Sequence, residues 1–365
     1  MTTALEFVRQ LGLGWNLGNT FDAFPLQGEH DRALKAGRIW TPEDQEGLWQ
    51  NRPFTPRCAR LVKQAGFDTI RIPVTWVEWI DGDGHVDSIW MNAVRRAVDW
   101  SLEAGLKVIV NVHHDGGEGD LPWIRKADQD PDGVCRRFAG LWREIADTFK
   151  DYGQDLILEG GNEIGFDGID RDRAYILLER LNQIFVDTVR ASGSSNADRF
   201  LLIPGYNTDT AMTCDPRYRL PHDSLPDRLI VSIHYYSPSD FVLATHDTTW
   251  CKPRQVWGDE ADVKAVEADF ATQRRRFIDA GVPVIIGEYG LLTEAVDGKD
   301  HESNLKWLST VLRCCRENGS CPVLWDTSTK EMCFLDRATG RFFDPDMAAL
   351  FAQAGAECRQ EGDEG

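Results

Sequence analysis

Residues 155–163 read DLILEGGNE, and residues 282–290 read VPVIIGEYG. Each stretch is a short apolar run that ends in a glutamate, Glu163 in the first and Glu288 in the second. An apolar run of this length, bounded by small residues, is typical of a strand buried on both faces. Parallel α/β proteins keep their chemistry at the carboxyl ends of such strands. The two glutamates are therefore candidate catalytic residues, although each could instead be a solvated loop residue.

Strand-like and helix-like segments alternate along the whole chain. We expect eight strands, at residues 12–17, 69–73, 107–113, 156–160, 200–204, 229–234, 284–288 and 322–326. Amphipathic stretches with apolar residues at helical spacing lie between them, at residues 56–65, 89–104, 134–149, 173–190, 261–280 and 302–317. This pattern predicts an α/β protein with a single (β/α)8 TIM barrel.

A doubly wound open sheet is the weaker alternative. It would usually carry a Gly-rich phosphate loop after its first strand, and residues 14–19 read GWNLGN instead. No linker, repeat or low-complexity run divides the chain. We expect one catalytic domain over residues 1–356 and a charged C-terminal tail over residues 357–365.

Composition limits the kinds of partner. The chain has 365 residues, 42% of them hydrophobic, which is enough for a large core, and its net charge is −19. An acidic protein is repelled by nucleic acid and by anionic membranes, so a neutral ligand is expected. No apolar stretch reaches the roughly 18 to 20 residues of a membrane span. The N-terminus lacks the pattern of a signal peptide, which leaves a cytoplasmic location and a removed signal peptide both open.

Nine cysteines cannot all pair, and their spacing does not match a zinc site. We expect mostly free thiols, with one or two disulfides open among Cys214, Cys251, Cys314, Cys315, Cys321 and Cys333. Thirteen tryptophans offer flat apolar faces that suit stacking on sugar rings, although most tryptophans fill cores. Trp76, Trp79, Trp123, Trp250 and Trp257 are each expected to pack rather than to bind sugar.

Polar or aromatic residues follow nearly every expected strand. They are Asn16, Asn19, Arg71, His113, His114, Asn162, Glu163, His234, Tyr236, Glu288 and Trp325. An arginine beside a carboxylate would hold it ionised, as a nucleophile requires. Tyr236 and the histidines could orient two carboxylates and keep their pKa values apart. Two strand-end carboxylates are the minimum for cleaving a glycosidic bond.

At these residues the sequence resembles glycoside hydrolase family 5, the endoglucanase-type retaining hydrolases. The matching stretches are GWNLGNT at 14–20, GFDTIRIPVTW at 66–76, VNVHHD at 110–115, EGGNE at 159–163, IHYYSP at 233–238, IGEYG at 286–290 and WD at 325–326. The resemblance implies Glu163 as general acid/base and Glu288 as nucleophile, with six residues around the cleaved sugar: Arg71, His113, Asn162, His234, Tyr236 and Trp325. One departure concerns loop geometry, because the family usually has proline after the acid/base and this chain has Ile164.

The resemblance implies a retaining endo-β-1,4-glucanase acting on cellulose-type or mixed-linkage β-glucan. A xyloglucanase or β-mannanase of the same family is the alternative, and a non-catalytic carbohydrate-binding barrel is the alternative from another class. We expect a monomer with no cofactor and no metal, and the resemblance favours secretion. A zinc site built from His113, His114, Asp115 and His234 stays open as a minor hypothesis.

Overall fold

The computed structural model describes residues 2–25, 37, 39–116, 122–247, 251–293, 299–329 and 331–363. Its centre is a closed barrel of eight parallel strands, each paired with its neighbours in chain order. The strands are β1 (Gly14–Asn16), β2 (Thr69–Ile72), β3 (Lys107–Asn111), β4 (Leu156–Glu159), β5 (Leu201–Pro204), β6 (Leu229–Tyr235), β7 (Val284–Tyr289) and β8 (Cys321–Leu324). The predicted (β/α)8 barrel is confirmed.

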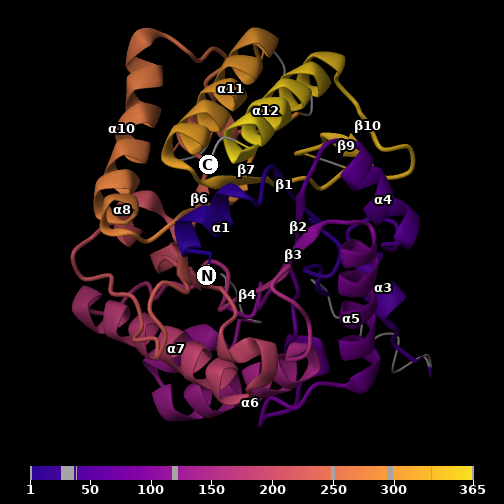
Figure 1. The fold of residues 1–365 in the computed structure, drawn as a ribbon, viewed down its shortest axis with the longest axis vertical. Helices are drawn as coiled ribbons and strands as arrows, with labels where there is room; N and C mark the ends of the chain where they lie inside the picture. The colour runs from indigo at the N-terminus through magenta and orange to yellow at the C-terminus, as the bar shows by residue number, and fades with distance from the viewer. Residues whose placement is uncertain are drawn as a thin grey trace.

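Helices surround the barrel (Figure 1). The longer ones are α4 (Pro56–Gln64), α5 (Ser88–Glu103), α6 (Pro131–Phe149), α7 (Arg171–Ala191), α10 (Glu260–Arg276), α11 (His301–Asn318) and α12 (Pro345–Asp363). Each begins at a residue that suits a helix N-terminus; in α6, for example, Asp130 caps the helix and Pro131 takes its first position. Between β5 and β6 the structure has only a short helix, α8 (Thr210–Thr213), and a 3-10 turn, η4 (Tyr206–Thr208).

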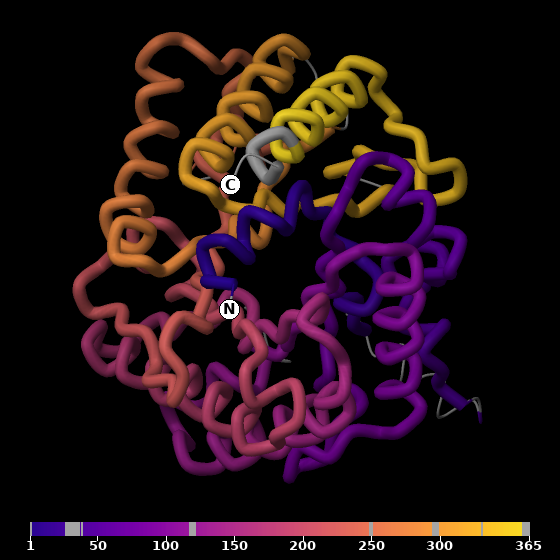
Figure 2. The backbone as a smooth tube through the Cα atoms, viewed as in Figure 1, coloured from indigo at the N-terminus to yellow at the C-terminus, as the bar shows by residue number. Residues whose placement is uncertain are grey.

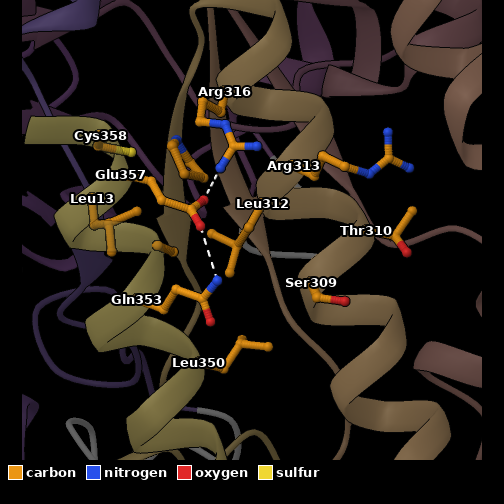
Figure 3. A pocket seen from close by; sticks show the side chains of 12 residues that line it. Leu13, Ser309, Thr310, Leu312, Arg313, Arg316, Leu350, Gln353, Glu357 and Cys358 are labelled. Carbon is orange, nitrogen blue, oxygen red and sulfur yellow. Dashed lines mark hydrogen bonds and ion pairs between the residues drawn. The ribbon is translucent and has the colours of Figure 1, made fainter. Parts of the chain in front are cut away.

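The shorter elements are α1 (Ala4–Arg9), α3 (Pro42–Glu46), α9 (Ser239–Val242), a hairpin of β9 (Leu335–Asp336) and β10 (Arg341–Phe342), and the 3-10 turns η1 (Val77–Trp79), η2 (Ile124–Asp128), η3 (Ser194–Ala197) and η5 (Ile278–Ala280). Residues 357–363, expected as part of a charged tail, continue helix α12. A pocket of about 290 Å³ lies between α11 and α12, where Arg316 pairs with Glu357 (Figure 3); it contains none of the strand-end residues.

Helix α1 closes the amino end of the barrel, a feature that the sequence did not predict. Its side chains Phe7 and Val8 share an apolar cluster with Ile109, Ile157 and Ile230 of three strands. Figures 1 and 2 show this helix, in indigo, lying across the middle of the ring of helices. Successive residues of a strand point to opposite sides, so the flanking residues of these strands pack outward against the helices. The lumen is therefore solidly apolar at this end.

A bulge in β7 changes which residues point into the lumen. Ile285 lies in the inner apolar cluster, and Tyr289 lies in the outer one. Strict alternation between them would point Glu288 outward, but the register with β6 shifts so that His234 pairs with Glu288. Gly287 makes the bulge possible, because a Cβ there would lie 2.8 Å from Ser232 Oγ and 3.2 Å from His234 Nε2. Both Gly287 and Glu288 can then sit on the lumen side.

The remaining expectations concern tryptophans and cysteines. Trp76, Trp79, Trp123 and Trp257 are buried, as expected for packing residues, and Trp250 lies outside the described residues. The nine cysteines are thiols, so the open disulfides do not form in this structure. In the part of the chain that the structure describes, no helix is long and apolar enough to cross a membrane.

Candidate active site

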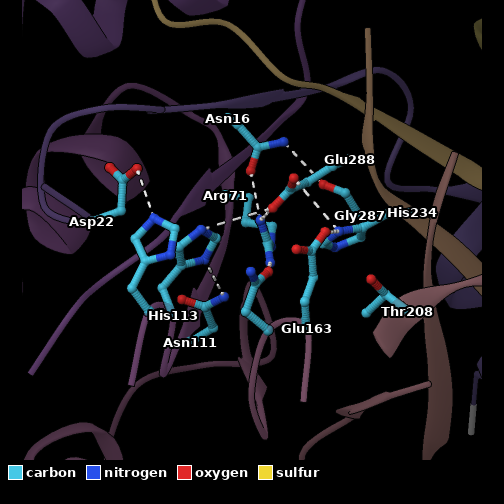
Figure 4. Close-up of polar contacts among 12 residues, drawn as sticks. Asn16, Asp22, Arg71, Asn111, His113, Glu163, Thr208, His234, Gly287 and Glu288 are labelled. Carbon is cyan, nitrogen blue, oxygen red and sulfur yellow. Dashed lines mark hydrogen bonds and ion pairs between the residues drawn. The ribbon is translucent and has the colours of Figure 1, made fainter. Parts of the chain in front are cut away.

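Arg71 lies at the centre of the polar contacts in the carboxyl end of the barrel lumen (Figure 4). It is fully buried on β2, and its Nε donates to Glu159 Oε2 at 2.6 Å while its Nη1 donates to Glu288 Oε1 at 2.8 Å. Its Nη2 donates to Asn162 Oδ1 at 2.8 Å. Burial alone would lower the pKa of Arg71, but the two carboxylates raise it, so the guanidinium stays charged. One cation thus fixes a structural carboxylate, a candidate catalytic carboxylate and an amide.

Glu288 is held from several sides. Besides the Arg71 contact, the Tyr236 hydroxyl donates to Oε2 at 3.0 Å, and His234 Nδ1 lies 3.5 Å from the same oxygen. Burial and the charges of the two glutamates raise the pKa of Tyr236 well above its usual value, so its hydroxyl stays a donor. The Glu288 side chain is only 7% exposed. This carboxylate has a fixed orientation and little contact with water.

Glu163 lies in the loop after β4 and is far more open. Its side chain is 43% exposed, and it contacts His234, whose Nδ1 lies 2.8 Å from Oε1. One oxygen from each of Glu163 and Glu288 and one nitrogen of His234 all lie within 4.8 Å of one another. At least one pair of carboxylate oxygens is therefore closer than the roughly 6.5 Å or more that separates the carboxyl groups of an inverting pair.

The pKa values of the two glutamates move in opposite directions in the free protein. Desolvation, the largest single effect, raises the pKa of Glu163, but the hydrogen bond with His234 and the charges of neighbouring groups together outweigh it and lower the pKa overall. Burial raises the pKa of Glu288, against the opposing charges of His234 and Arg71. That order alone would suit Glu288 as the acid. Arg71 and Tyr236 both donate to Glu288, and each of these hydrogen bonds favours its ionised form, whereas Glu163 contacts a histidine that lies near both carboxylates.

Two adjacent histidines extend the site from β3. His113 Nε2 lies 4.0 Å from Glu288 Oε1, and its Nδ1 lies 3.1 Å from Asn111 Nδ2. Burial lowers the pKa of His113 well below its usual value and that of His114 to about 4, so both rings are neutral near pH 7. His114 Nε2 lies 4.0 Å from Asp22, a buried carboxyl group whose pKa burial raises to about 7.

A row of aromatic rings leads away from Glu288. The His113 ring stacks on Trp325 at a centroid distance of 5.7 Å, and His114 lies against His113 at 4.4 Å. Phe24 and Trp49 continue the row, each within 6 Å of the His114 ring. Phe24, Trp49, His114 and Trp325 are partly exposed. We call these four residues together with His113 the aromatic row. It offers flat surfaces of the kind that stack on sugar rings.

The structure brings most of the expected residues together. Arg71, His113, Asn162, Glu163, His234, Tyr236 and Glu288 form one connected cluster, with Trp325 and His114 beside it. Asn19 takes a turn after β1 with φ of 56°, where its backbone donates to Asp22 and its carbonyl accepts from Asn51. Sequence reasoning missed Glu159, Asn111 and Asp22. Glu159 lies two residues after Ile157 and so on the same face of β4, but only the structure shows that this face is the lumen.

The structure does not assemble the zinc set that the sequence left open. Asp115 accepts from the Trp76 backbone at 2.8 Å and from Trp123 Nε1 at 2.7 Å, so it braces two loops. Instead, His113 and His114 group with Asp22, and His234 groups with Glu163 and Glu288. Both oxygens of Asp22 already accept backbone hydrogen bonds, from Asn19 and Thr20.

Comparison with known proteins bears on this arrangement. The family model for cellulases, glycosyl hydrolase family 5, matches residues 34–331. The chain is 31% identical over 363 residues to a xyloglucan-specific endo-β-1,4-glucanase of Bacteroides ovatus, covering 93% of this chain and 68% of that protein. It is also 31% identical to endoglucanase A of Paenibacillus barcinonensis, over 89% of this chain and 82% of that protein.

Solved structures show the same architecture over nearly the full length. A broad-specificity endoglucanase from an uncultured bovine rumen ciliate superposes with a TM-score of 0.88 at 38% identity, covering 98% of this chain and 99% of that chain. A family 5 lichenase from Caldicellulosiruptor sp. F32, solved in complex with cellotetraose, gives a TM-score of 0.86 at 27% identity, covering 97% of this chain and 96% of that chain.

Proposed function

This chain belongs to the cellulases of glycosyl hydrolase family 5, and from that premise we propose that it is a retaining endo-β-1,4-glucanase with Glu163 as general acid/base and Glu288 as nucleophile. The observation that carries the proposal is the pair itself. Two carboxylates, one after β4 and one on β7, have oxygens within 4.8 Å; Glu288 is buried against an arginine and Glu163 is open toward solvent. The assignment of the two roles rests on the resemblance, and the hydrogen bonds to Glu288 support it.

The proposed reaction has two steps. In the first, Glu163 protonates the oxygen of the leaving sugar while Glu288 attacks the anomeric carbon and forms a glycosyl-enzyme. In the second, Glu163 removes a proton from water, which displaces Glu288 from the anomeric carbon. Arg71 and Tyr236 hold Glu288 in its reactive orientation. Glu159, which accepts from Arg71 and from Ser232, balances the charge of the buried arginine before and after the attack.

The substrate we propose is a neutral β-1,4-linked glucan. A net charge of −19 disfavours polyanionic glycans, and the aromatic row offers stacking surfaces beside the carboxylates. Cellulose-type or mixed-linkage glucan is the first choice. The related proteins include a xyloglucan-specific enzyme and a lichenase, which supports an open specificity among glucans. Xyloglucan is the second choice and mannan the third.

A polysaccharide panel tests the substrate. Carboxymethylcellulose, barley β-glucan, xyloglucan and glucomannan are incubated with the protein, and the products are sized over time. We expect the glucans to give a mixture of oligosaccharides from the earliest time points. Mannan cleaved faster than every glucan would contradict the glucanase proposal, and release of monosaccharide alone would contradict internal cleavage.

Product stereochemistry tests the mechanism. An NMR time course on a short cello-oligosaccharide should show the β-anomer first, with the α-anomer appearing only by mutarotation. The Glu288→Gln variant is the matched blank, because it keeps the shape of the side chain and lacks the nucleophile. Appearance of the α-anomer as the initial product would overturn the retaining assignment.

A further inference from the structure

The loop that carries Glu163 is fastened to the end of the next strand, β5. After Glu163, the chain runs through Ile164, Gly165 and Phe166 without regular secondary structure. Tyr206 and Asn207, in the turn η4 that follows β5, contact all three of these residues. We call Tyr206 and Asn207 the β5 clasp. Resting on the proposed function, we propose that the β5 clasp positions Glu163 for general acid/base catalysis.

Tyr206 holds Phe166 by two hydrogen bonds through one hydroxyl. The hydroxyl oxygen accepts from the Phe166 N–H at 2.9 Å, and the hydroxyl donates to the Phe166 carbonyl at 3.0 Å. Tyr206 is 6% exposed, and its ring lies against Tyr175 at a centroid distance of 4.4 Å. Because the buried hydroxyl both accepts and donates a hydrogen bond, its orientation is fixed. The loop end at Phe166 is therefore held in place relative to β5.

Asn207 holds the middle of the loop. Its N–H donates to the Ile164 carbonyl at 2.9 Å. Its side chain closes over Gly165, where an added Cβ would lie 2.6 Å from Asn207 Oδ1. The Ile164 N–H in turn donates to the Asn162 carbonyl at 3.1 Å, a bond that a proline at residue 164 could not make. The exit from β4 is therefore set by hydrogen bonds across the strands.

The β5 turn is held against the ordinary preferences of its backbone. Asn207 and Thr208 both have left-handed backbone angles, with φ of 52° and 49°. This region is uncommon for non-glycine residues and is an outlier for a β-branched residue such as threonine. Strain of this kind persists only where the surroundings impose it, and it gathers at functional sites. Here the strained turn aims the Asn207 N–H at the loop that carries Glu163.

The carboxylate of Glu163 and the backbone that follows it are thus held by different elements. His234, from β6, contacts the carboxylate at 2.8 Å, while the β5 clasp holds the backbone that follows. The side chain itself is 43% exposed and has little packing to restrain it. A small displacement of the loop would move the carboxylate from the leaving oxygen, and misplacement of about 1 Å can cost a large factor in rate.

The test uses aryl β-cellobiosides that differ in their leaving groups. Phenyl β-cellobioside needs protonation by the acid, whereas 2,4-dinitrophenyl β-cellobioside leaves without it. For Tyr206→Phe we expect kcat/KM on the phenyl substrate to fall about fivefold to tenfold, the range for one lost hydrogen bond, and to change less than about twofold on the dinitrophenyl substrate. Added azide should raise kcat of the variant on the dinitrophenyl substrate.

Tyr175→Phe is the matched control. Its hydroxyl donates to the Met212 carbonyl at 2.7 Å, so this change also removes a tyrosine-to-backbone hydrogen bond, one ring away from the clasp. We expect it to treat both substrates alike. Equal loss on both substrates for Tyr206→Phe, or the same selectivity in Tyr175→Phe, would overturn the positioning role.

A second pair of variants covers the case in which Tyr206→Phe does not fold. Gly165→Ala places a methyl group against Asn207 Oδ1, at a residue whose backbone angle alanine tolerates. We expect about a tenfold loss that is confined to the phenyl substrate. Adding Asn207→Gly to this variant removes the clash and keeps the N–H, so it should recover at least threefold. No recovery, or a loss shared by both substrates, would overturn the inference.

Glu163→Ala, assayed in parallel, separates this inference from the proposed function. Selective loss on the phenyl substrate in Glu163→Ala, without it in the clasp variants, would overturn the clasp alone. Equal loss on both substrates in Glu163→Ala would instead contradict the role proposed for Glu163.

Discussion

The two ends of the barrel lumen differ completely, although the same strands build both. On β4, Ile157 packs with α1 in the apolar end, and Glu159, two residues later, accepts from Arg71. On β6 the same step leads from Ile230 through Ser232 to His234. The apolar end is held by packing, and the charged end is held by hydrogen bonds around one buried arginine. Stability and chemistry are thus separated by about two residues along each strand.

The largest expected effect comes from the charged end. Glu288→Gln should lower kcat/KM on a soluble β-glucan by at least about 10⁴-fold, because the nucleophile acts in the transition state. The melting temperature should be unchanged or higher, since the change removes a buried charge close to Glu163. Steady-state kinetics, calorimetric binding of cellotetraose and thermal unfolding check this. Activity above about 1% of the unchanged protein, beyond what contamination explains, would contradict it.

Arg71→Met tests whether the charged end depends on its single cation. The variant leaves Glu159 and Glu288 buried without their guanidinium partner. We expect the free energy of unfolding to fall by about 3 to 5 kcal/mol, with activity lost as well. Denaturant unfolding measures this. The double variant Arg71→Met with Glu159→Gln should regain part of the stability but not the activity. If the two losses in the free energy of unfolding simply add, Arg71 and Glu159 do not stabilise each other, and the prediction is wrong.

Ile157→Ala is the corresponding change at the apolar end. It removes a fully buried side chain from the cluster with α1, and we expect a loss of about 2 to 4 kcal/mol in the free energy of unfolding. The kcat/KM of the folded fraction should stay within twofold. A larger fall in kcat/KM at a temperature where the variant is folded would show that the two ends are coupled.

The smallest expected effect concerns pH. Burial lowers the pKa of His114 to about 4 in the folded protein. As the pH falls below about 6.5, His114 therefore becomes protonated in the unfolded chain while it stays neutral in the folded protein. His114 therefore contributes stability above that pH and loses it on the way to pH 4. In His114→Gln the loss of stability between pH 8 and pH 4 should be smaller by about 1 to 2 kcal/mol. Solvent screening keeps the effect this small, because the His114 side chain is 29% exposed. Denaturant unfolding from pH 4 to 8 measures it, with Ile157→Ala as the control that should not change the slope.

Sequence reasoning reached the barrel and most of the cluster because both depend on local patterns. A buried strand followed by a polar residue is visible in any one segment, and closing the barrel brings those ends together. Arg71, His113 and Glu288 were found in this way, and the family was then confirmed.

The features that were missed depend on contacts between distant segments. Glu159 looked like part of the strand, because nothing local says which face of β4 is the lumen. The bulge that turns Glu288 inward needs the register of β6 against β7, and the β5 clasp needs two loops to meet in space. Helix α1 is only six residues long, too short for a periodic pattern to stand out.

The position of α1 at the amino end of the barrel also determines how this protein can be attached to a surface or to another module. Helix α1 covers the amino end of the barrel, and Gly355 of α12 packs near Leu13, just before β1, so α1 and this part of α12 lie on the side away from the carboxylates. Figure 1 shows α1 close to α12. A tag, a surface linker or a fused module at either end would therefore leave the catalytic mouth turned outward, toward an insoluble polymer. Attachment by the ends should cost little activity on solid substrate, whereas random coupling through surface lysines would block some mouths.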